Sequence, residues 1–268
     1  MPSAFDFDSL VNNFDQVQPL MAGATTGILE HVPPLGHGTT VLDIACGTGE
    51  PGLTLAEHRP GTHLIGVDSA EPMVGAARRK AEAKGLADTR FAVMDSRHLD
   101  LADASVDCVV SRFGVLSFAD PMAEAREMSR VLRPDGGFAV ATWDAASKNV
   151  LTYAIASAVD EWLPPQATAA MRRMEQFAMP GRRESWLRQA GFSKVDSSLW
   201  TWPVEFADEE AMWALAGGPA MLQAVVTGLD DDHTHQARDR VRDLTSEYRR
   251  SDGTYVLPYA CRLLWGTR

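Results

Sequence analysis

The sequence has few of the features that mark secreted, metal-stapled or membrane-spanning proteins. It contains three cysteines in 268 residues, and Cys46, Cys108 and Cys261 lie far apart without C-x-x-C spacing. We therefore expect neither a disulfide scaffold nor a metal site, and a cytoplasmic location fits this cysteine usage. The segment "MPSAFDFDSLVNNFD" has acids where a signal peptide carries positive charge. No apolar run approaches the roughly 20 residues that cross a bilayer, so no membrane span is predicted.

Positive charge is also scarce. The chain has 25 Lys and Arg against 36 Asp and Glu, which gives a formal net charge of −11. A polyanion such as DNA or RNA would be repelled on average, so we expect no nucleic-acid partner. The two most basic stretches, "AARRK" and "GRRESWLR", are interpreted as solvated helix faces.

The middle of the chain alternates apolar strands with helices. The strands predicted between residues 39 and 144 are "TTVLDIA", "HLIGVD", "TRFAVMD", "VDCVVSRF" and "FAVATWD". Strands of nearly continuous apolar character, separated by helices, predict a parallel sheet that is covered on both faces.

The parts of the chain on either side of this region have a different predicted organisation. The sequence predicts an N-terminal helical lid segment at residues 1–37 and a binding core at residues 38–145. Residues 146–268 predict the remainder of the sheet with helical cap insertions at about 146–180 and 208–250, and the last strand falls at 254–266. We expect the cap to cover the carboxyl edge of the sheet, where open α/β sheets bind ligands.

One glycine-rich stretch raises the question of which nucleotide the core binds. "VLDIACGTGEPG" satisfies G-x-G-x-x-G through Gly47, Gly49 and Gly52, a pattern usually associated with nicotinamide dinucleotides. An acid at the end of the second strand can accept hydrogen bonds from the ribose of a nicotinamide dinucleotide or of another nucleotide. An NAD(P)-dependent oxidoreductase therefore remains an alternative.

Carboxylates at three successive strands favour a different ligand. Asp43 lies within the first strand, and Asp68 and Asp95 end the second and third. These positions suit a charged amine, a ribose and the exocyclic amine of adenine. S-adenosyl-L-methionine carries all three groups and a sulfonium cation, and it has no pyrophosphate that would require an anion site.

Four stretches together carry a family resemblance: "VLDIACGTG", "LIGVDSAEPM", "FAVMDSRHLDLADASVDCVVSRFGV" and "EMSRVLRPDGGFAVATW". In order and spacing they resemble the motifs of class I S-adenosylmethionine-dependent methyltransferases. They are most similar to the branch of ubiquinone/menaquinone-biosynthesis and natural-product enzymes. The resemblance covers about residues 38–144. It implies an α/β, Rossmann-like, doubly wound sheet of seven strands, with an antiparallel last strand and a helical cap.

The resemblance also implies roles for individual residues. The turn from Ala45 to Gly49 would pass under the methionine moiety with Asp43 supporting it, although the family often has Gly where Ala45 stands. Asp68 would hold the ribose. The implied cofactor-binding residues are Asp43, Ala45, Gly47, Thr48, Gly49, Asp68, Ser69, Met73, Asp95, Ser96 and Ser111. Ser69 and Met73 would flank the adenine, Asp95 and Ser96 would bind its edge, and Ser111 would lie near the methyl group.

The sequence indicates much less about the molecule that accepts the methyl group. Methyl transfer is an in-line displacement that needs mainly alignment, and we identify no catalytic base. The stretch "SRFGVL" lacks the Asn/Asp-Pro-Pro-aromatic motif of enzymes that methylate nucleic-acid bases. The residues predicted to line a substrate pocket are Phe14, Met21, Arg112, Phe113, Trp143, Tyr153, Phe177 and Trp213.

Such a lining favours a small apolar or aromatic metabolite, from natural-product or quinone-like biosynthesis. An alternative is a chain that uses the cofactor structurally and catalyses a non-methylating cyclisation. The sequence leaves the oligomeric state, including a homodimer, open.

Overall fold

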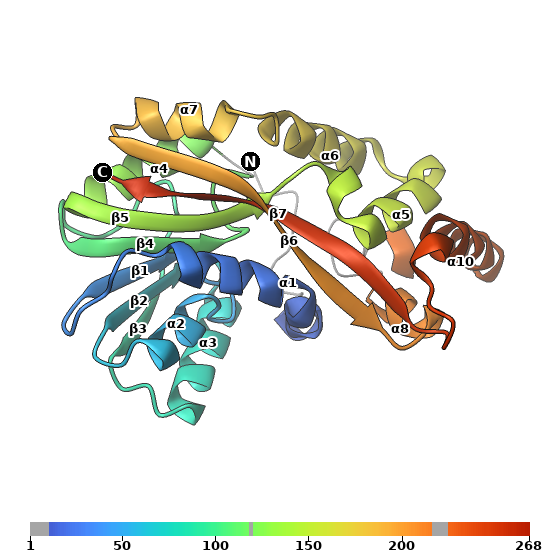
Figure 1. Cartoon of the computed structure of the whole chain (residues 1–268), viewed down its shortest axis with the longest axis horizontal. Coiled ribbons are helices and arrows are strands. Elements are labelled where there is room, and N and C mark those ends of the chain that lie inside the picture. The colour runs from blue at the N-terminus through green and yellow to red at the C-terminus, as the bar shows by residue number, and fades with distance from the viewer. Residues whose placement is uncertain (1–10, 118–119, 216–224) are drawn as a thin grey trace. The chain divides into compact units, whose positions relative to one another are not determined.

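A seven-stranded sheet organises the chain. The structure, a computed structural model, describes residues 11–117, 120–215 and 225–268. The strand order is β3-β2-β1-β4-β5-β7-β6 (Figure 1). The strands are β1 (Thr40–Ile44), β2 (His63–Asp68), β3 (Thr89–Val93), β4 (Val106–Arg112), β5 (Leu132–Trp143), β6 (Lys194–Phe206) and β7 (Tyr255–Thr267).

The central strands are parallel and buried. β1 pairs with β2 on one side and β4 on the other, so that Asp43 lies opposite Gly66 and Val110. β7 runs antiparallel to β5. The apolar run "VLDI" is buried along its whole length because it lies at the centre of the sheet. The predicted fold class is confirmed.

The strand order places the helices of the doubly wound core. The order reverses between β1 and β4, and right-handed crossovers then put the helices of the two halves of the sheet on opposite faces. α2 (Gly52–His58) and α3 (Glu71–Ala83) lie on one side of the sheet, and α4 (Pro121–Val131) and α7 (Arg182–Gln189) lie on the other (Figure 1). α4 begins at Asp120, whose carboxylate accepts a hydrogen bond from the backbone N–H of Ala123.

The chain divides into two compact units. The core unit comprises residues 22–143, 177–200 and 261–268. The accessory unit comprises the described parts of 1–21, 144–176 and 201–260. Residues 1–10 of the predicted lid and 216–224 of the predicted second insertion lie outside the described residues.

The accessory unit is mainly helical. Its complete elements are η2 (Ala146–Lys148), α5 (Val150–Ala158), η3 (Asp160–Trp162), α8 (Glu209–Ala214), α10 (Asp231–Thr245) and η4 (Ser246–Tyr248). α6 (Pro165–Phe177) lies in it except for its last residue, and α1 (Val11–His31) contributes to both units.

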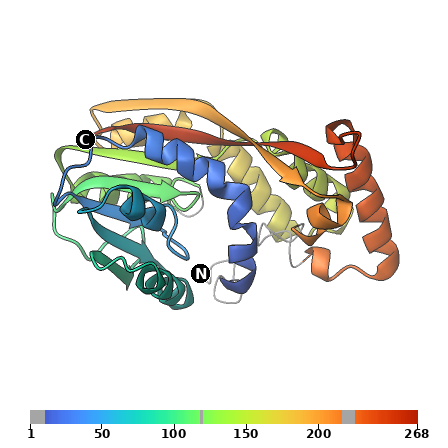
Figure 2. The same ribbon diagram turned by 60° about the horizontal axis from the view of Figure 1, so that its bottom comes forward.

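α10, drawn in dark orange in Figure 2, packs against α5 in the accessory unit. The guanidinium of Arg240 donates to the carbonyl of Ala158 at the end of α5 (3.0 Å). It also lies over the Trp162 ring, 5.3 Å from the ring centroid. Ion pairs from Arg238 and Arg242 join α10 to α8. Within the three described ranges, no helix is long and apolar enough to cross a membrane.

Candidate functional site

The glycine-rich turn after β1 adopts a backbone that side chains disfavour. Ala45, Gly47 and Gly49 have φ angles of 55°, 54° and 115°. Glycine adopts such angles freely, whereas alanine is strained there by about 1 kcal/mol. The left-handed angle at Ala45 accounts for the family's usual glycine at this position.

Asp43 supports the far end of this turn. Its Oδ2 accepts a hydrogen bond from the backbone N–H of Gly52 (2.9 Å). The side chain is fully buried, and its Oδ1 has no hydrogen-bond partner within the described part of the chain. Burial raises the pKa of Asp43 from 3.8 to about 8, although the bond from Gly52 and the charge of Arg112 act in the opposite direction.

Asp68 supports the near end of the same turn. Its two oxygens accept hydrogen bonds from the backbone N–H groups of Gly47 (2.9 Å) and Ala70 (3.0 Å). The structure therefore brings Asp43 and Asp68 to the two ends of one turn.

Asp95 and Ser96 follow β3 and have protein partners of their own. Asp95 forms an exposed ion pair with Arg97 (2.6 Å), and the hydrogen bonds from Arg97 lower its pKa. The hydroxyl of Ser96 donates to Glu124 (2.9 Å). Of the two residues predicted to flank an adenine, Met73 is buried and Ser69 is exposed.

Thr48 and Ser111 are both fully buried. The hydroxyl of Thr48 accepts a hydrogen bond from the ammonium of Lys80 on α3 (2.8 Å). The hydroxyl of Ser111 donates to the carbonyl of Ile44 (2.7 Å) and so links the ends of β4 and β1. This bond gives Ser111 a structural role; its predicted contact with the cofactor stays a prediction.

The carboxyl ends of β4 and β5 carry three of the residues predicted for the acceptor. The buried guanidinium of Arg112 donates to the hydroxyl of Thr25 in α1 (2.8 Å). The rings of Phe113 and Trp143 are stacked, with centroids 3.9 Å apart and an interplanar angle of 17°. The ends of β4 and β5 therefore present a planar aromatic pair.

The other predicted pocket residues are distributed over both units. Phe177 belongs to the core unit, where its ring meets Trp186 edge-on. The remaining four, Phe14, Met21, Tyr153 and Trp213, belong to the accessory unit. That all eight line one pocket stays a prediction.

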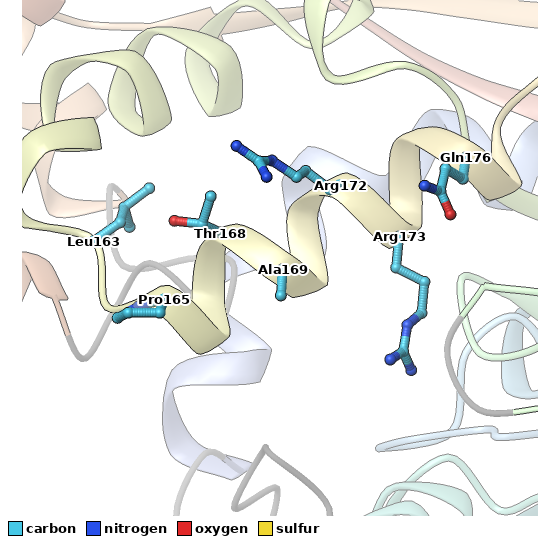
Figure 3. A pocket seen from close by; sticks show the side chains of 7 residues that line it. All are labelled: Leu163, Pro165, Thr168, Ala169, Arg172, Arg173 and Gln176. Carbon is cyan, nitrogen blue, oxygen red and sulfur yellow. The ribbon is translucent and has the colours of Figure 1, made fainter.

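Two hollows in the surface lie at other places. One, of about 490 Å³, runs along α6 in the accessory unit (Figure 3). It is lined by Leu163, Pro165, Thr168, Ala169, Arg172, Arg173 and Gln176. A second, of about 310 Å³, lies beside Thr39 and Gly137 at the amino ends of the strands. Neither is lined by a predicted site residue, so neither bears on the predicted cofactor site.

Three charged residues that hydrogen-bond to Thr48 or to Leu116 were missed by the sequence analysis. Lys80 and Arg183 lie in the basic stretches interpreted as solvated, and this interpretation is wrong for Arg183, which is 3% exposed. Its Nε donates to the carbonyl of Leu116 (3.2 Å). Glu124 is 2% exposed, and burial raises its pKa to about 7. A charged residue with polar neighbours in sequence gives no signal of burial, because its partners lie on other elements.

Comparison with known proteins agrees with this geometry. Residues 41–136 match the family described as "Methyltransferase domain". Demethylmenaquinone methyltransferase of Thermus thermophilus is 44% identical over 100 residues, which are 37% of this chain and 45% of that protein. The chain thus spans less than half of that relative's length.

Two other similarities extend over most of the chain. Nocamycin O-methyltransferase of Saccharothrix syringae is 28% identical over 237 residues, covering 83% of this chain and 84% of that protein. The crystal structure of the YcgJ protein of Bacillus subtilis covers 92% of this chain and 98% of its own, with a TM-score of 0.59 and 21% identity. At that identity the structural match shows the fold alone. Residues 41–136 are thus similar to the methyltransferase domain family, in the part of the chain where the motifs predicted this similarity.

Proposed function

We propose that the chain is an S-adenosyl-L-methionine-dependent methyltransferase that acts on a small apolar or aromatic metabolite. The observation that carries the proposal is the glycine turn held at both ends by carboxylates, Asp43 at Gly52 and Asp68 at Gly47. The relatives support the substrate class, since their names refer to demethylmenaquinone and to nocamycin.

The residues present fit the cofactor. Asp43 keeps one buried oxygen without a partner among the described residues, and burial raises its pKa to about 8 although the charge of Arg112 acts to lower it. A ligand that carries an ammonium and a sulfonium supplies positive charge to such a site. The left-handed φ angles of the turn expose backbone rather than side chains to a ligand.

We assign the cofactor contacts as the family resemblance implies. Asp43 and the turn from Ala45 to Gly49 hold the amino-acid end, and Asp68 holds the ribose. Around the adenine and the methyl group lie Ser69, Met73, Asp95, Ser96 and Ser111. Arg97 donates hydrogen bonds to both oxygens of Asp95. A hydrogen bond from the adenine amine to Asp95 therefore requires that the amine and Arg97 share this carboxylate.

Catalysis on this account is mainly positioning. The cofactor supplies a methyl group on a positively charged sulfur, which is already an activated leaving group. The chain's own residues hold the reactants in line and exclude water, and a base is needed only if the acceptor must lose a proton. We assign no catalytic base.

The acceptor side is supported by the aromatic pair of Phe113 and Trp143. Phe113 is buried and Trp143 is partly exposed, so the exposed part of the indole offers a flat apolar surface in the core unit. An aromatic ring stacks on such a surface with about 1 kcal/mol beyond its buried area.

Incubation of the full chain with methyl-labelled cofactor and a panel of hydroquinones and phenols tests the proposal. We expect label in an organic-soluble product, analysed by mass spectrometry, and loss of that label in Asp68→Ala. A product of unchanged mass would instead identify a non-methylating reaction such as cyclisation. Failure of the chain to bind either the cofactor or S-adenosylhomocysteine would refute the proposal.

We also propose a reducing, cytoplasmic compartment, because Cys46, Cys108 and Cys261 are all buried and lie far apart in the sequence without C-x-x-C spacing. A homodimer stays a prediction that gel filtration can test.

A further inference from the structure

The loop that follows β4, residues 113–117 (the β4 loop), has an unfavourable backbone. Phe113 and Leu116 have φ angles of 62° and 57°, although neither is glycine. Each such residue costs about 1 kcal/mol or more and persists only where its surroundings fix it. The bonds made to this loop are therefore informative.

Two buried charged side chains hold the backbone of Leu116 from both sides. Its N–H donates to Oε2 of Glu124 on α4 (2.7 Å), and its carbonyl accepts from Nε of Arg183 on α7 (3.2 Å). Glu124 is 2% exposed and Arg183 is 3% exposed. Hydrogen bonds to ionised groups are stronger than neutral ones, and burying such groups is costly unless these bonds are made.

Glu124 also holds a second loop. Its other oxygen, Oε1, accepts a hydrogen bond from the hydroxyl of Ser96 in the loop after β3 (2.9 Å). One buried carboxylate therefore connects the loops that follow β3 and β4.

The β4 loop in turn packs against the glycine turn. A Cβ placed on Gly114 would lie 2.3 Å from the Cβ and 3.0 Å from the carbonyl oxygen of Ala45. This contact leaves no free space, so a displacement of the β4 loop displaces the turn or opens a gap beside it.

We propose that Glu124 and Arg183 are positioning residues for the cofactor site. They hold the β4 loop against the glycine turn, and Glu124 couples this loop through Ser96 to the side that receives the adenine. Neither residue needs to touch the cofactor. The inference rests on the proposed function, because it assigns these residues to the binding of that cofactor.

The test combines two measurements on the full chain: amide hydrogen exchange of residues 113–117 and calorimetric titration with S-adenosylhomocysteine. Glu124→Ala removes both hydrogen bonds. We expect exchange of the β4 loop to accelerate at least tenfold and the affinity to fall about tenfold, the effect of losing buried bonds to a charged group.

Glu124→Gln is the rescue variant, because its amide oxygen still accepts from Leu116. We expect both quantities to stay within about threefold of the original chain. Glu82→Gln makes the same change at an exposed position of α3 and should leave both unchanged. Arg183→Met removes the bond to the carbonyl of Leu116. It should accelerate exchange and weaken binding, which keeps the proposal testable if Glu124→Ala does not fold.

The outcomes separate the inference from the proposed function. Faster exchange with unchanged affinity in Glu124→Ala or Arg183→Met would overturn the inference, since the two residues would then serve the fold alone. Unchanged exchange in both variants would also overturn it. If the original chain does not bind S-adenosylhomocysteine, the proposed function fails first, and the variants show no difference in binding.

Discussion

The core unit and the accessory unit are held together by different kinds of interaction. In the core unit, buried parallel strands fix the register, and the carboxylates of Asp43, which is buried, and Asp68, which is partly buried, accept hydrogen bonds from backbone N–H groups near the strand ends. In the accessory unit, α8 and α10 are joined by exposed ion pairs such as Arg238–Glu210. The family match at residues 41–136 lies wholly within the core unit.

This difference explains why the cofactor side is easier to identify than the acceptor side. A turn with left-handed φ angles requires glycine or strain, and a buried acid requires a reason to be buried, so both leave a pattern in the sequence. Aligning an apolar acceptor requires only suitably placed apolar side chains, which look like any other core residues.

The largest effect we expect comes from Gly114→Ala in the core unit. The new methyl group would lie 2.3 Å from the Cβ of Ala45. Relieving this overlap should cost ~3 kcal/mol of unfolding free energy and abolish binding of S-adenosylhomocysteine. Denaturant unfolding and calorimetry measure the two effects.

Two further variants identify the cause of that effect. Ala45→Gly removes the opposing methyl group and a left-handed alanine, so the double variant should recover part of the lost stability. Gly75→Ala in α3 meets no atom closer than 3.5 Å and should stabilise the helix slightly. An equal loss in the single and double variants would show that the β4 loop and the turn are not in contact.

Asp68→Ala should have the next largest effect. It removes the acceptor for Gly47 and Ala70 and the proposed ribose contact, so the affinity for S-adenosylhomocysteine should fall by ~2 kcal/mol. Asp239→Ala, on the exposed surface of α10, is the matched change in the accessory unit and should leave affinity unchanged. Equal affinities for all three proteins would remove Asp68 from the site.

The stability of the core unit should also depend on pH through Asp43. Its pKa is raised from 3.8 to about 8, so the folded chain holds this proton more tightly than the unfolded chain. The stability that this proton contributes is complete below pH 4 and is lost as the pH rises to about 8.

Asp43→Asn removes this dependence because it cannot ionise. Relative to the original chain, the variant should gain roughly 2.5 kcal/mol of unfolding free energy between pH 6 and pH 8.5, while its affinity for the cofactor falls. Thermal unfolding across this pH range measures the gain. A difference in unfolding free energy between the two proteins that does not change with pH would contradict a raised pKa of the buried Asp43 carboxyl.

The smallest effect is expected in the accessory unit. Arg238→Gln breaks an exposed ion pair with Glu210 and should cost less than about 1 kcal/mol of unfolding free energy, with no change in cofactor affinity. Since Arg238 also lies over the Trp213 ring, a larger loss in a thermal melt would show that this cation–aromatic contact dominates.

Much of the core unit was predictable from sequence because its signals are local. The five apolar runs became β1 to β5, and "TYVLPYACRLLWG" became the antiparallel β7. Asp43 and Asp68 were identified because each acid interrupts or ends an apolar strand. Whether the assigned residues contact the cofactor, and whether the chain divides at residues 37 and 145, stays a prediction.

The unpredicted features depend on contacts between distant elements. Arg183 looked solvated because its neighbours Arg182 and Glu184 are polar, yet its partner is the carbonyl of Leu116, 67 positions away. Glu124 joins Ser96 and Leu116, which lie on two other loops. No pattern within one helix shows that such residues will be buried.

Calorimetric titration of the full chain with S-adenosylhomocysteine, and separately with NAD(P), is the most direct test of the account. We expect saturable binding of the demethylated cofactor that weakens in Asp68→Ala, and no binding of either dinucleotide. Absence of heat with S-adenosylhomocysteine, or saturable binding of NAD(P) in its place, would contradict the account.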